Sequence, residues 1–147
     1  MKKPSGDSLQ PNWIDIEDFE FICFNLTREL LSFDEPIPDY STRDNSLLES
    51  SLASPRQAYE ITGAGLTEQA AILFYSLIKN HPFRNGNKRI AVISILVFLS
   101  LNKKWLDIPP HLLYKLAVIV ATSSPNIRSE VLKDTKGILE EYIIDKI

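Results

Sequence analysis

The residue types best suited to chemistry on a phosphate lie together in one short segment, His81-Pro82-Phe83-Arg84-Asn85-Gly86-Asn87-Lys88-Arg89. Gly86 can adopt backbone angles that other residues resist, so the chain can turn tightly there. The residues after it begin an apolar stretch with helical character, and the first N–H groups of a helix have no internal partners and attract anions. Lys88 and Arg89 add two positive charges at that point. The pattern predicts a phosphate cradle.

A histidine, His81, lies shortly before this cradle. A neutral imidazole can accept the proton of a hydroxyl, which is the task of a general base. A base beside a phosphate cradle predicts transfer of a phosphoryl or nucleotidyl group to an alcohol. A lone histidine after a helix is more often a polar loop residue, and His111 after Pro109-Pro110 fits that description. The order of histidine, apolar anchor, glycine, asparagine and two cations sets His81 apart.

The overall charge hides this local excess of positive residues. The chain has 147 residues, with 16 Lys and Arg against 19 Asp and Glu, and a net charge of −3. This composition is typical of one globular domain that can bury a core without disulfides or a structural metal. A pI of about 5.4 argues against a protein dedicated to binding nucleic acid. Between Gln69 and Leu106, however, there are six Lys or Arg residues and no acidic residue.

The remaining features exclude other classes of protein. The single cysteine, Cys23, lies in an apolar run and is expected to be a buried hydrophobic residue. One cysteine and two distant histidines do not fit a zinc site. The longest apolar stretch, Ile90 to Leu101, is too short to span a bilayer, which needs about 18 residues. No secretory signal is visible, so we expect a cytoplasmic protein.

The positions of apolar residues and helix breakers predict an all-α fold. Residues 1–12 are polar and contain two prolines, which is typical of a flexible arm, and residues 13–147 are expected to form a single domain. The segment 33–43 is expected to be a loop. Helices are expected at residues 14–32, 44–53, 67–79, 87–101, 109–122 and 127–145.

One of these helices is expected to lie at the centre of the fold. Residues 87–101 are apolar on nearly every side, which is typical of a helix buried within a domain. Ser54-Pro55 is expected to end the helix at residues 44–53. Residues 55–66, which contain Gly63 and Gly65, are expected to form a flexible loop or a small β-hairpin flap. No other stretch has the alternation that would predict a sheet.

The segment 81–89 resembles the signature of the Fic/Doc family, which reads His-Pro-Phe, two residues, Gly-Asn, Gly or Lys, and Arg. An upstream run, residues 43–55, resembles the death-on-curing branch of that family. Members of the branch often carry Leu-Leu-Glu-Ser-Ala-Leu there, and this chain has Leu47-Leu48-Glu49-Ser50-Ser51-Leu52. The likeness extends over roughly residues 15–140 and implies the compact helical fold of the family.

The resemblance also implies roles for the residues of the signature. Part of a nucleotide, usually ATP with a magnesium ion, would be transferred to a hydroxyl of a target protein, with His81 as the general base and Phe83 as a core anchor. The cradle and the phosphate contacts would come from Asn85, Gly86, Asn87, Lys88 and Arg89. Asn85 stands where the family usually has an acidic magnesium ligand. An amide oxygen can bind Mg²⁺, but without a negative charge.

Two positions bear on which group is transferred. Members that transfer AMP typically have glycine where this chain has Lys88 and a second arginine where it has Val92. Both departures match the death-on-curing branch, whose members are toxins that phosphorylate a translation elongation factor. We therefore predict phosphate transfer from ATP. AMP transfer by a Fic-type enzyme, or a weakened nucleotide-binding homologue in which Asn85 reduces metal binding, remain the alternatives.

The resemblance makes two further expectations. The chain has no Ser/Thr-x-x-x-Glu-Gly/Asn segment of the kind that self-inhibited members use, so inhibition by a separate antitoxin is expected. In the family, a flap beside the site holds the target by strand-like pairing, and residues 55–66 are the candidate for it. Trp13 and Trp105 are expected to pack in the core or at its edge and not to stack on a ligand.

Overall fold

Helices make up nearly all the regular structure of the chain. The computed structural model describes residues 10–31 and 36–146. The first helical stretch joins α2 (Ile16–Phe19), a π-helical turn (Glu20–Phe24) and α3 (Asn25–Leu30). The later helices are α4 (Asn45–Thr62), α5 (Leu66–Asn80), α6 (Asn87–Leu101), α7 (Pro110–Thr122) and α8 (Arg128–Tyr142), with short 3-10 helices at Tyr40–Thr42 and Pro125–Ile127. The predicted all-α fold class is confirmed.

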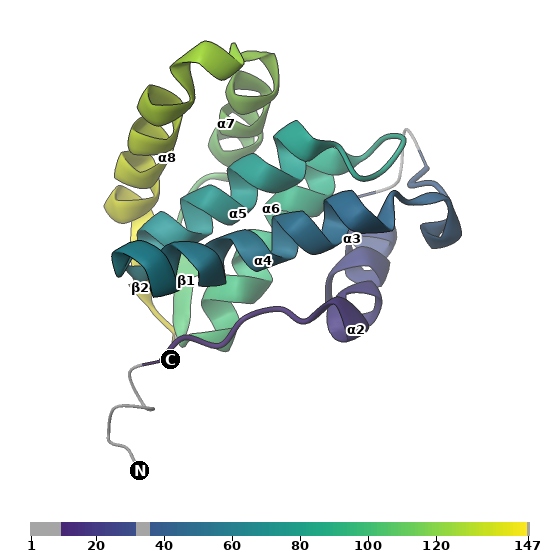
Figure 1. Cartoon of the computed structure of the whole chain (residues 1–147), viewed down its shortest axis with the longest axis horizontal. Helices are drawn as coiled ribbons and strands as arrows, with labels where there is room; N and C mark the ends of the chain where they lie inside the picture. Colours follow the sequence, from purple (N-terminus) through teal and green to yellow (C-terminus); the bar gives the residue numbers. More distant parts are fainter. Residues whose placement is uncertain (1–9, 32–35, 147) are drawn as a thin grey trace.

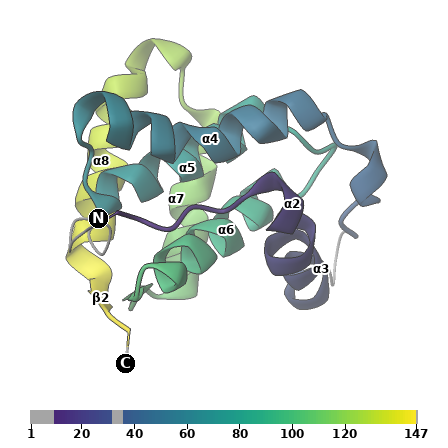
Figure 2. The ribbon, with the colours of Figure 1, turned by 60° about the horizontal axis from the view of Figure 1, so that its bottom comes forward.

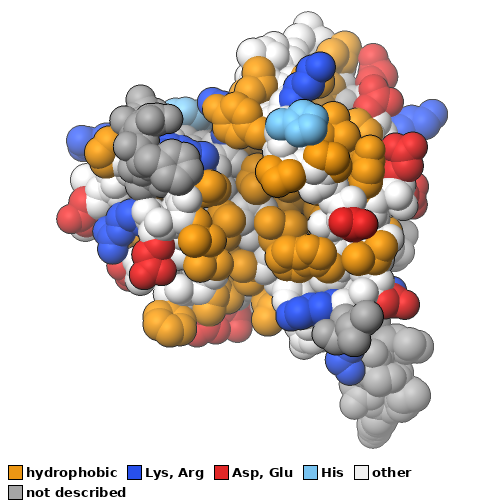
Figure 3. Space-filling model, turned by 180° about the vertical axis from the view of Figure 1, so that it is seen from behind, with side chains coloured by type: hydrophobic (Ala, Val, Ile, Leu, Met, Phe, Trp, Pro, Cys, Tyr) orange, Lys and Arg blue, Asp and Glu red, His pale blue; other side chains and the backbone are white. Residues whose placement is uncertain are grey.

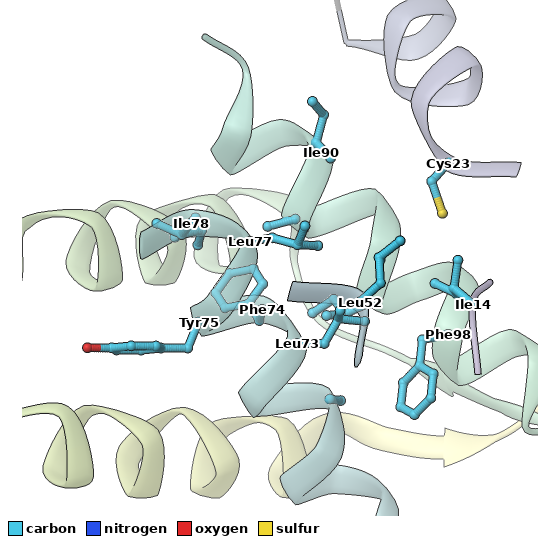
Figure 4. Packing of buried hydrophobic residues seen from close by; sticks show 14 of the residues in the cluster. Ile14, Cys23, Leu52, Leu73, Phe74, Tyr75, Leu77, Ile78, Ile90 and Phe98 are labelled. Carbon is cyan, nitrogen blue, oxygen red and sulfur yellow. The ribbon is translucent and has the colours of Figure 1, made fainter. Parts of the chain in front are cut away.

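The helix α6 lies at the centre of this arrangement. It packs against α5, α7 and the π turn, and α5 in turn packs against α4 (Figure 1). Figure 2 shows α3 beside α6. Ile90, Ile95 and Phe98 of α6 have no exposed surface, and Figure 4 shows Ile90 and Phe98 among the buried side chains, with Leu73 and Leu77 of α5. The central apolar helix predicted at 87–101 is confirmed at both ends.

The second predicted helix is longer than the sequence indicated. The helix α4 continues through Pro55 to Thr62, so the predicted helix end at Ser54-Pro55 is wrong. The predicted loop or β-hairpin flap at 55–66 is also wrong, because most of it is helical. Proline lacks the N–H that would bond the carbonyl of Ser51, and the hydroxyl of Ser54 donates to that carbonyl instead, at 2.7 Å. The helix ends at Gly63, whose φ of 70° is left-handed.

A small sheet was also missed. β1 (Lys104–Leu106) pairs antiparallel with β2 (Ile143–Asp145), with Trp105 opposite Ile144. The helix predicted to run to residue 145 therefore ends at Tyr142, and its last residues are a strand. Strands of three residues are too short to show alternation in the sequence, and the pairing joins segments far apart in the chain. Only the tertiary packing of the helices between them brings these two strands together.

The start of the described chain is held by specific contacts. The predicted arm at 1–12 lies mostly outside the described residues, but the N–H of Asn12 donates to Oδ1 of Asn102 at 2.7 Å. The next residue, Trp13, packs at the edge of the core, as expected. Its ring lies 5.6 Å from that of Tyr59, and its Nε1 donates to Oε1 of Gln69 at 2.9 Å.

The structure also tests the expectations about Cys23 and about membrane-spanning helices. Cys23 has no exposed surface, which confirms its reading as a buried hydrophobic residue. Burial raises the pKa of its thiol from 9.0 to about 12, while the nearby hydroxyl of Ser94 lowers it in part. Within the described ranges, no helix combines the length and apolar content needed to cross a membrane.

Candidate active site

The loop between α5 and α6 is anchored by one aromatic side chain, Phe83. This residue is 2% exposed and packs within a cluster of rings. Its centroid lies 5.3 Å from that of Phe24, 6.1 Å from that of Tyr40 and 6.2 Å from that of Phe19. Aromatic pairs at such distances stabilise a fold beyond the area they bury. Segments far apart in sequence thus fix the position of the loop.

The side chain of Asn87 holds the same loop from the other side. Its Oδ1 accepts from the backbone N–H of Phe83 at 3.0 Å, and its Nδ2 donates to the carbonyl of Phe83 at 2.8 Å. Asn87 is 5% exposed, so both polar atoms of its side chain are committed to the loop. What Asn87 can offer to an anion is therefore its backbone N–H at the start of α6.

His81 lies at the edge of a pocket of about 380 Å³. It is the residue at which α5 ends, and its backbone is left-handed, with φ 55° and ψ 55°. The side chain is exposed to solvent. The pocket is lined by Ile78, Lys79, His81, Arg84, Asn85, Gly86, Asn87, Lys88 and Ala121, which include three cations and, among the described residues, no acid. The structure thus brings His81 together with the predicted cradle in a positively charged pocket.

The start of α6 forms one wall of this pocket. Gly86 is the N-cap residue, with φ 80°, and no side chain caps the first turn. The first intrahelical bond runs from the N–H of Ile90 to the carbonyl of Gly86, at 2.8 Å, so the three preceding N–H groups have no acceptor within the helix. A Cβ at position 86 would lie 2.5 Å from Cδ1 of Ile37. Both the backbone angle and the space require glycine here.

Asn85 bears on the magnesium ion that the resemblance implies. Its Oδ1 is buried and has no hydrogen-bond partner in the structure. Buried polar atoms are normally paired, so this oxygen is available to a ligand. Within the described residues, no group of three or more His, Cys, Asp or Glu side chains could hold a metal ion. The residues present therefore fit a single amide ligand, with phosphate oxygens and water supplying the rest of the coordination.

Arg89 and Val92 do not line the pocket that contains His81. The Nη1 of Arg89 donates to the carbonyl of Leu31 at 2.7 Å. Both residues line a separate, mainly apolar cavity of about 890 Å³ between α6, α7 and β1, with Leu96, Leu113 and Tyr114 among its other walls. Figure 3 shows the hydrophobic side chains gathered on this face. Arg89 thus lines this cavity and not the pocket of His81, while its Nη2 lies 3.3 Å from where a Cβ on Gly86 would lie.

The segment beside the signature loop is 36–44, in place of the predicted flap at 55–66. The backbone N–H of Asp44 donates to the carbonyl of Pro82 at 2.8 Å. Ile37 is 6% exposed and its side chain lies against Gly86. The predicted loop at 33–43 is partly outside the described residues, and within it Tyr40–Thr42 forms a 3-10 helix. The prolines at 36 and 38 indicated that this segment is a loop. They did not indicate that it lies against the signature loop, because that contact depends on tertiary packing.

Lys79, a cation of the pocket, was not among the site residues predicted from the sequence. The Nζ of Lys79 donates to the carbonyl of Ser123 at 2.6 Å and lies 3.4 Å from that of Ala121. These carbonyls end α7, where a cation is favourable. Lys79 therefore joins the pocket to α7 and adds to its positive charge. A lysine in the last turn of a helix is ordinary, so no sequence signal marked this contact.

Comparison with known proteins supports the predicted family. The model of the Fic/DOC family matches residues 13–99. This range runs from Trp13 nearly to the end of α6 and includes the whole signature. The match ends well before the roughly residue 140 expected from the sequence, so α7 and α8 lie outside it. A search of curated proteins found no match. On the family match, which covers more than half of its residues, the chain belongs to the Fic/DOC family.

Proposed function

We propose that the protein transfers a phosphate from ATP to a hydroxyl side chain of a target protein, as a toxin of the death-on-curing kind. The observation that carries the proposal is the pocket that joins His81 to Gly86, Asn85 and Lys88. A candidate base and a candidate phosphate cradle line one space of the size range of small-ligand sites. Membership of the Fic/DOC family supports an enzyme that acts on proteins.

The proposed reaction assigns a task to each part of this pocket. His81 accepts the proton of the target hydroxyl, whose oxygen attacks the γ-phosphorus of ATP. The bond between that phosphorus and the β–γ bridging oxygen breaks, and ADP leaves with the electron pair. Lys88 and the N–H groups at the start of α6 stabilise the charge on the phosphates. A magnesium ion bound at Asn85 would neutralise part of that charge.

Two side chains favour phosphate transfer over AMP transfer. Lys88 lines the pocket beside His81, where AMP-transferring relatives typically have glycine. Val92 is uncharged and faces the apolar cavity, so this turn of α6 offers no second arginine to the phosphates. A translation elongation factor is the target that the resemblance suggests. We also expect a separate antitoxin, because the chain lacks the self-inhibitory segment.

Two alternatives remain testable beside this proposal. AMP transfer would use the same base with the nucleotide bound in the opposite sense. A nucleotide-binding homologue with weakened catalysis is favoured by one observation, the neutral Asn85 at the expected metal position. That side chain offers an oxygen but no negative charge.

Labelled ATP separates the three readings. The purified chain is incubated with Mg²⁺, a translation elongation factor and ATP labelled at either the γ- or the α-phosphate. Phosphate transfer puts only the γ-label on the target, and His81→Ala abolishes it. The matched control is His111→Ala, which removes the other histidine, on α7 and outside the pocket of His81, and should leave transfer unchanged.

Two results would contradict the proposal. Label from the α-phosphate on the target would establish AMP transfer. Nucleotide binding without transfer of either label, equal in the wild-type chain and in His81→Ala, would establish a non-catalytic binder.

A further inference from the structure

The backbone of His81 is held in a conformation that its own side chain disfavours. Its φ of 55° and ψ of 55° lie in the left-handed region, and within the described residues only Lys103 shares a positive φ among residues other than glycine. A residue with a Cβ pays a free-energy cost there, so the conformation persists only where neighbouring contacts impose it. The two residues that flank His81 show which contacts these are.

The residue before His81 is bonded to α4. The Nδ2 of Asn80 donates to Oγ of Ser51 at 2.9 Å. Ser51 has no exposed surface, and its own hydroxyl donates to the carbonyl of Leu47 at 2.8 Å, the shorter of two possible bonds, with the carbonyl of Ser76 at 3.3 Å. The serine oxygen is therefore a fixed acceptor in a buried position. It holds the last residue of α5 against the middle of α4.

The residue after His81 is bonded to the start of the same helix. The carbonyl of Pro82, which is buried, accepts from the backbone N–H of Asp44 at 2.8 Å. Asp44 is the N-cap residue of α4, and its carboxylate accepts from the N–H of Leu47 at 3.1 Å. Through Ser51 and Asp44, α4 thus holds the chain on both sides of His81, which itself lines the pocket.

We propose that Ser51 and Asn80 are positioning residues that set the place of the His81 imidazole through the bond between them. This inference rests on the proposed role of His81 as general base. A general base must come within about 2.6–3.2 Å of the proton it abstracts, so a displaced backbone at residue 81 carries a direct cost in rate. Neither Ser51 nor Asn80 lines the pocket, so both act through His81.

A purely structural role for the same bond has different consequences. In that case, loss of the bond would weaken packing between α4 and α5 without moving His81. Thr62 supplies the matched control, because its hydroxyl also donates to a backbone carbonyl in α4, that of Ala58, at 2.8 Å, and it is the last residue of the helix. Ser51→Ala and Thr62→Ala each remove one such hydroxyl from the same helix. The run that the sequence resembles has alanine at position 51, so Ser51→Ala is expected to fold.

Nuclear magnetic resonance of the imidazole groups tests the positioning directly. The chain has two histidines, His81 and His111, so a ¹H–¹³C spectrum of the imidazole rings contains two Cε1–H signals to assign, one from each residue. In Ser51→Ala and in Asn80→Ala we expect the His81 signal to shift or split, and the His111 signal to stay in place. In Thr62→Ala both signals should stay. An unmoved His81 signal in folded Ser51→Ala and Asn80→Ala would overturn the proposal.

Kinetics supply the second readout. If the chain transfers phosphate, kcat should fall roughly 10- to 100-fold in Ser51→Ala and Asn80→Ala, the range that misplacement by about an ångström produces. The KM for ATP should stay unchanged, and Thr62→Ala should keep the wild-type kcat. A moved His81 signal with wild-type kcat would also overturn the proposal. If no transfer occurs at all, the proposed function fails, and the spectra still decide whether α4 positions His81.

Discussion

The side chain of Asn87 closes the signature loop by bonding both backbone groups of Phe83, at 3.0 Å and 2.8 Å. Phe83 is in turn fixed among the rings of α2, the π turn and the 3-10 helix at Tyr40–Thr42. The pair therefore joins the start of α6 to the aromatic cluster. Everything between these two residues, including Asn85 and Gly86, is held at both ends.

Replacement of Asn87 should destabilise the whole chain. Asn87→Ala leaves a buried N–H and a buried carbonyl of Phe83 without partners, each of which costs about 1–3 kcal/mol. We expect the free energy of unfolding, measured in urea, to fall by about 2–4 kcal/mol. The control is Asn126→Ala, at an exposed residue, which should change it little. A loss as small as that of the control would contradict the structural role of Asn87.

The two glycines Gly86 and Gly137 should respond in opposite directions to alanine. Gly86→Ala places a Cβ at a φ of 80°, which costs about 1–2 kcal/mol, and pushes it against Ile37, so the unfolding free energy should fall by more than that. Gly137 lies within α8, and a Cβ there meets nothing within 4 Å. Gly137→Ala should raise the stability by about 0.5–1 kcal/mol. Similar effects of the two substitutions would refute the assigned geometry.

The buried thiol of Cys23 should make the fold less stable in alkali. Its pKa is 9.0 in an ordinary environment and about 12 in the fold, so the folded chain retains a proton that the unfolded chain loses. The stabilisation is complete below pH 9 and is lost as the pH rises toward 12, with a slope of at most about 1.4 kcal/mol per pH unit. Cys23→Ala should lack this contribution when urea unfolding is compared between pH 8 and pH 11.

The reactivity of the same thiol gives an independent check. A protonated, buried thiol is a poor nucleophile, so iodoacetamide at pH 8 should alkylate Cys23 only after unfolding in urea. Rapid alkylation of the native chain would show that the thiol is accessible, contrary to its buried position within the π turn.

An acid at position 85 should strengthen metal binding. The Oδ1 of Asn85 is buried without a partner in the pocket of His81, and Asn85→Asp would put a negative charge among Lys79, Arg84 and Lys88. We expect tighter binding of Mg²⁺ in the presence of ATP, measured by titration calorimetry, by about tenfold or more for one added carboxylate ligand. Asn126→Asp, which adds the same charge outside the pocket, is the control. Equal affinities in the two variants would show that residue 85 is not a metal ligand.

The sequence determined the central helix and the signature because their signals are local. Gly86 begins α6, an apolar stretch continues it to Leu101, and Phe83 is the large apolar residue between the two helices. Each of these depends on neighbouring residues along the chain, where backbone angles and helical period act. The family resemblance rested on the nine residues 81–89 and was confirmed by the family match.

Only the tertiary structure decided what lies beside the site and which way its residues face. Pro55 continues a helix because the hydroxyl of Ser54 replaces the missing hydrogen bond, and residues 143–145 form a strand because β1 lies alongside them. Arg89 bonds the carbonyl of Leu31 and lines a cavity other than the pocket of His81. These outcomes depend on partners distant in the sequence, and the free energy of such contacts exists only once the chain has folded.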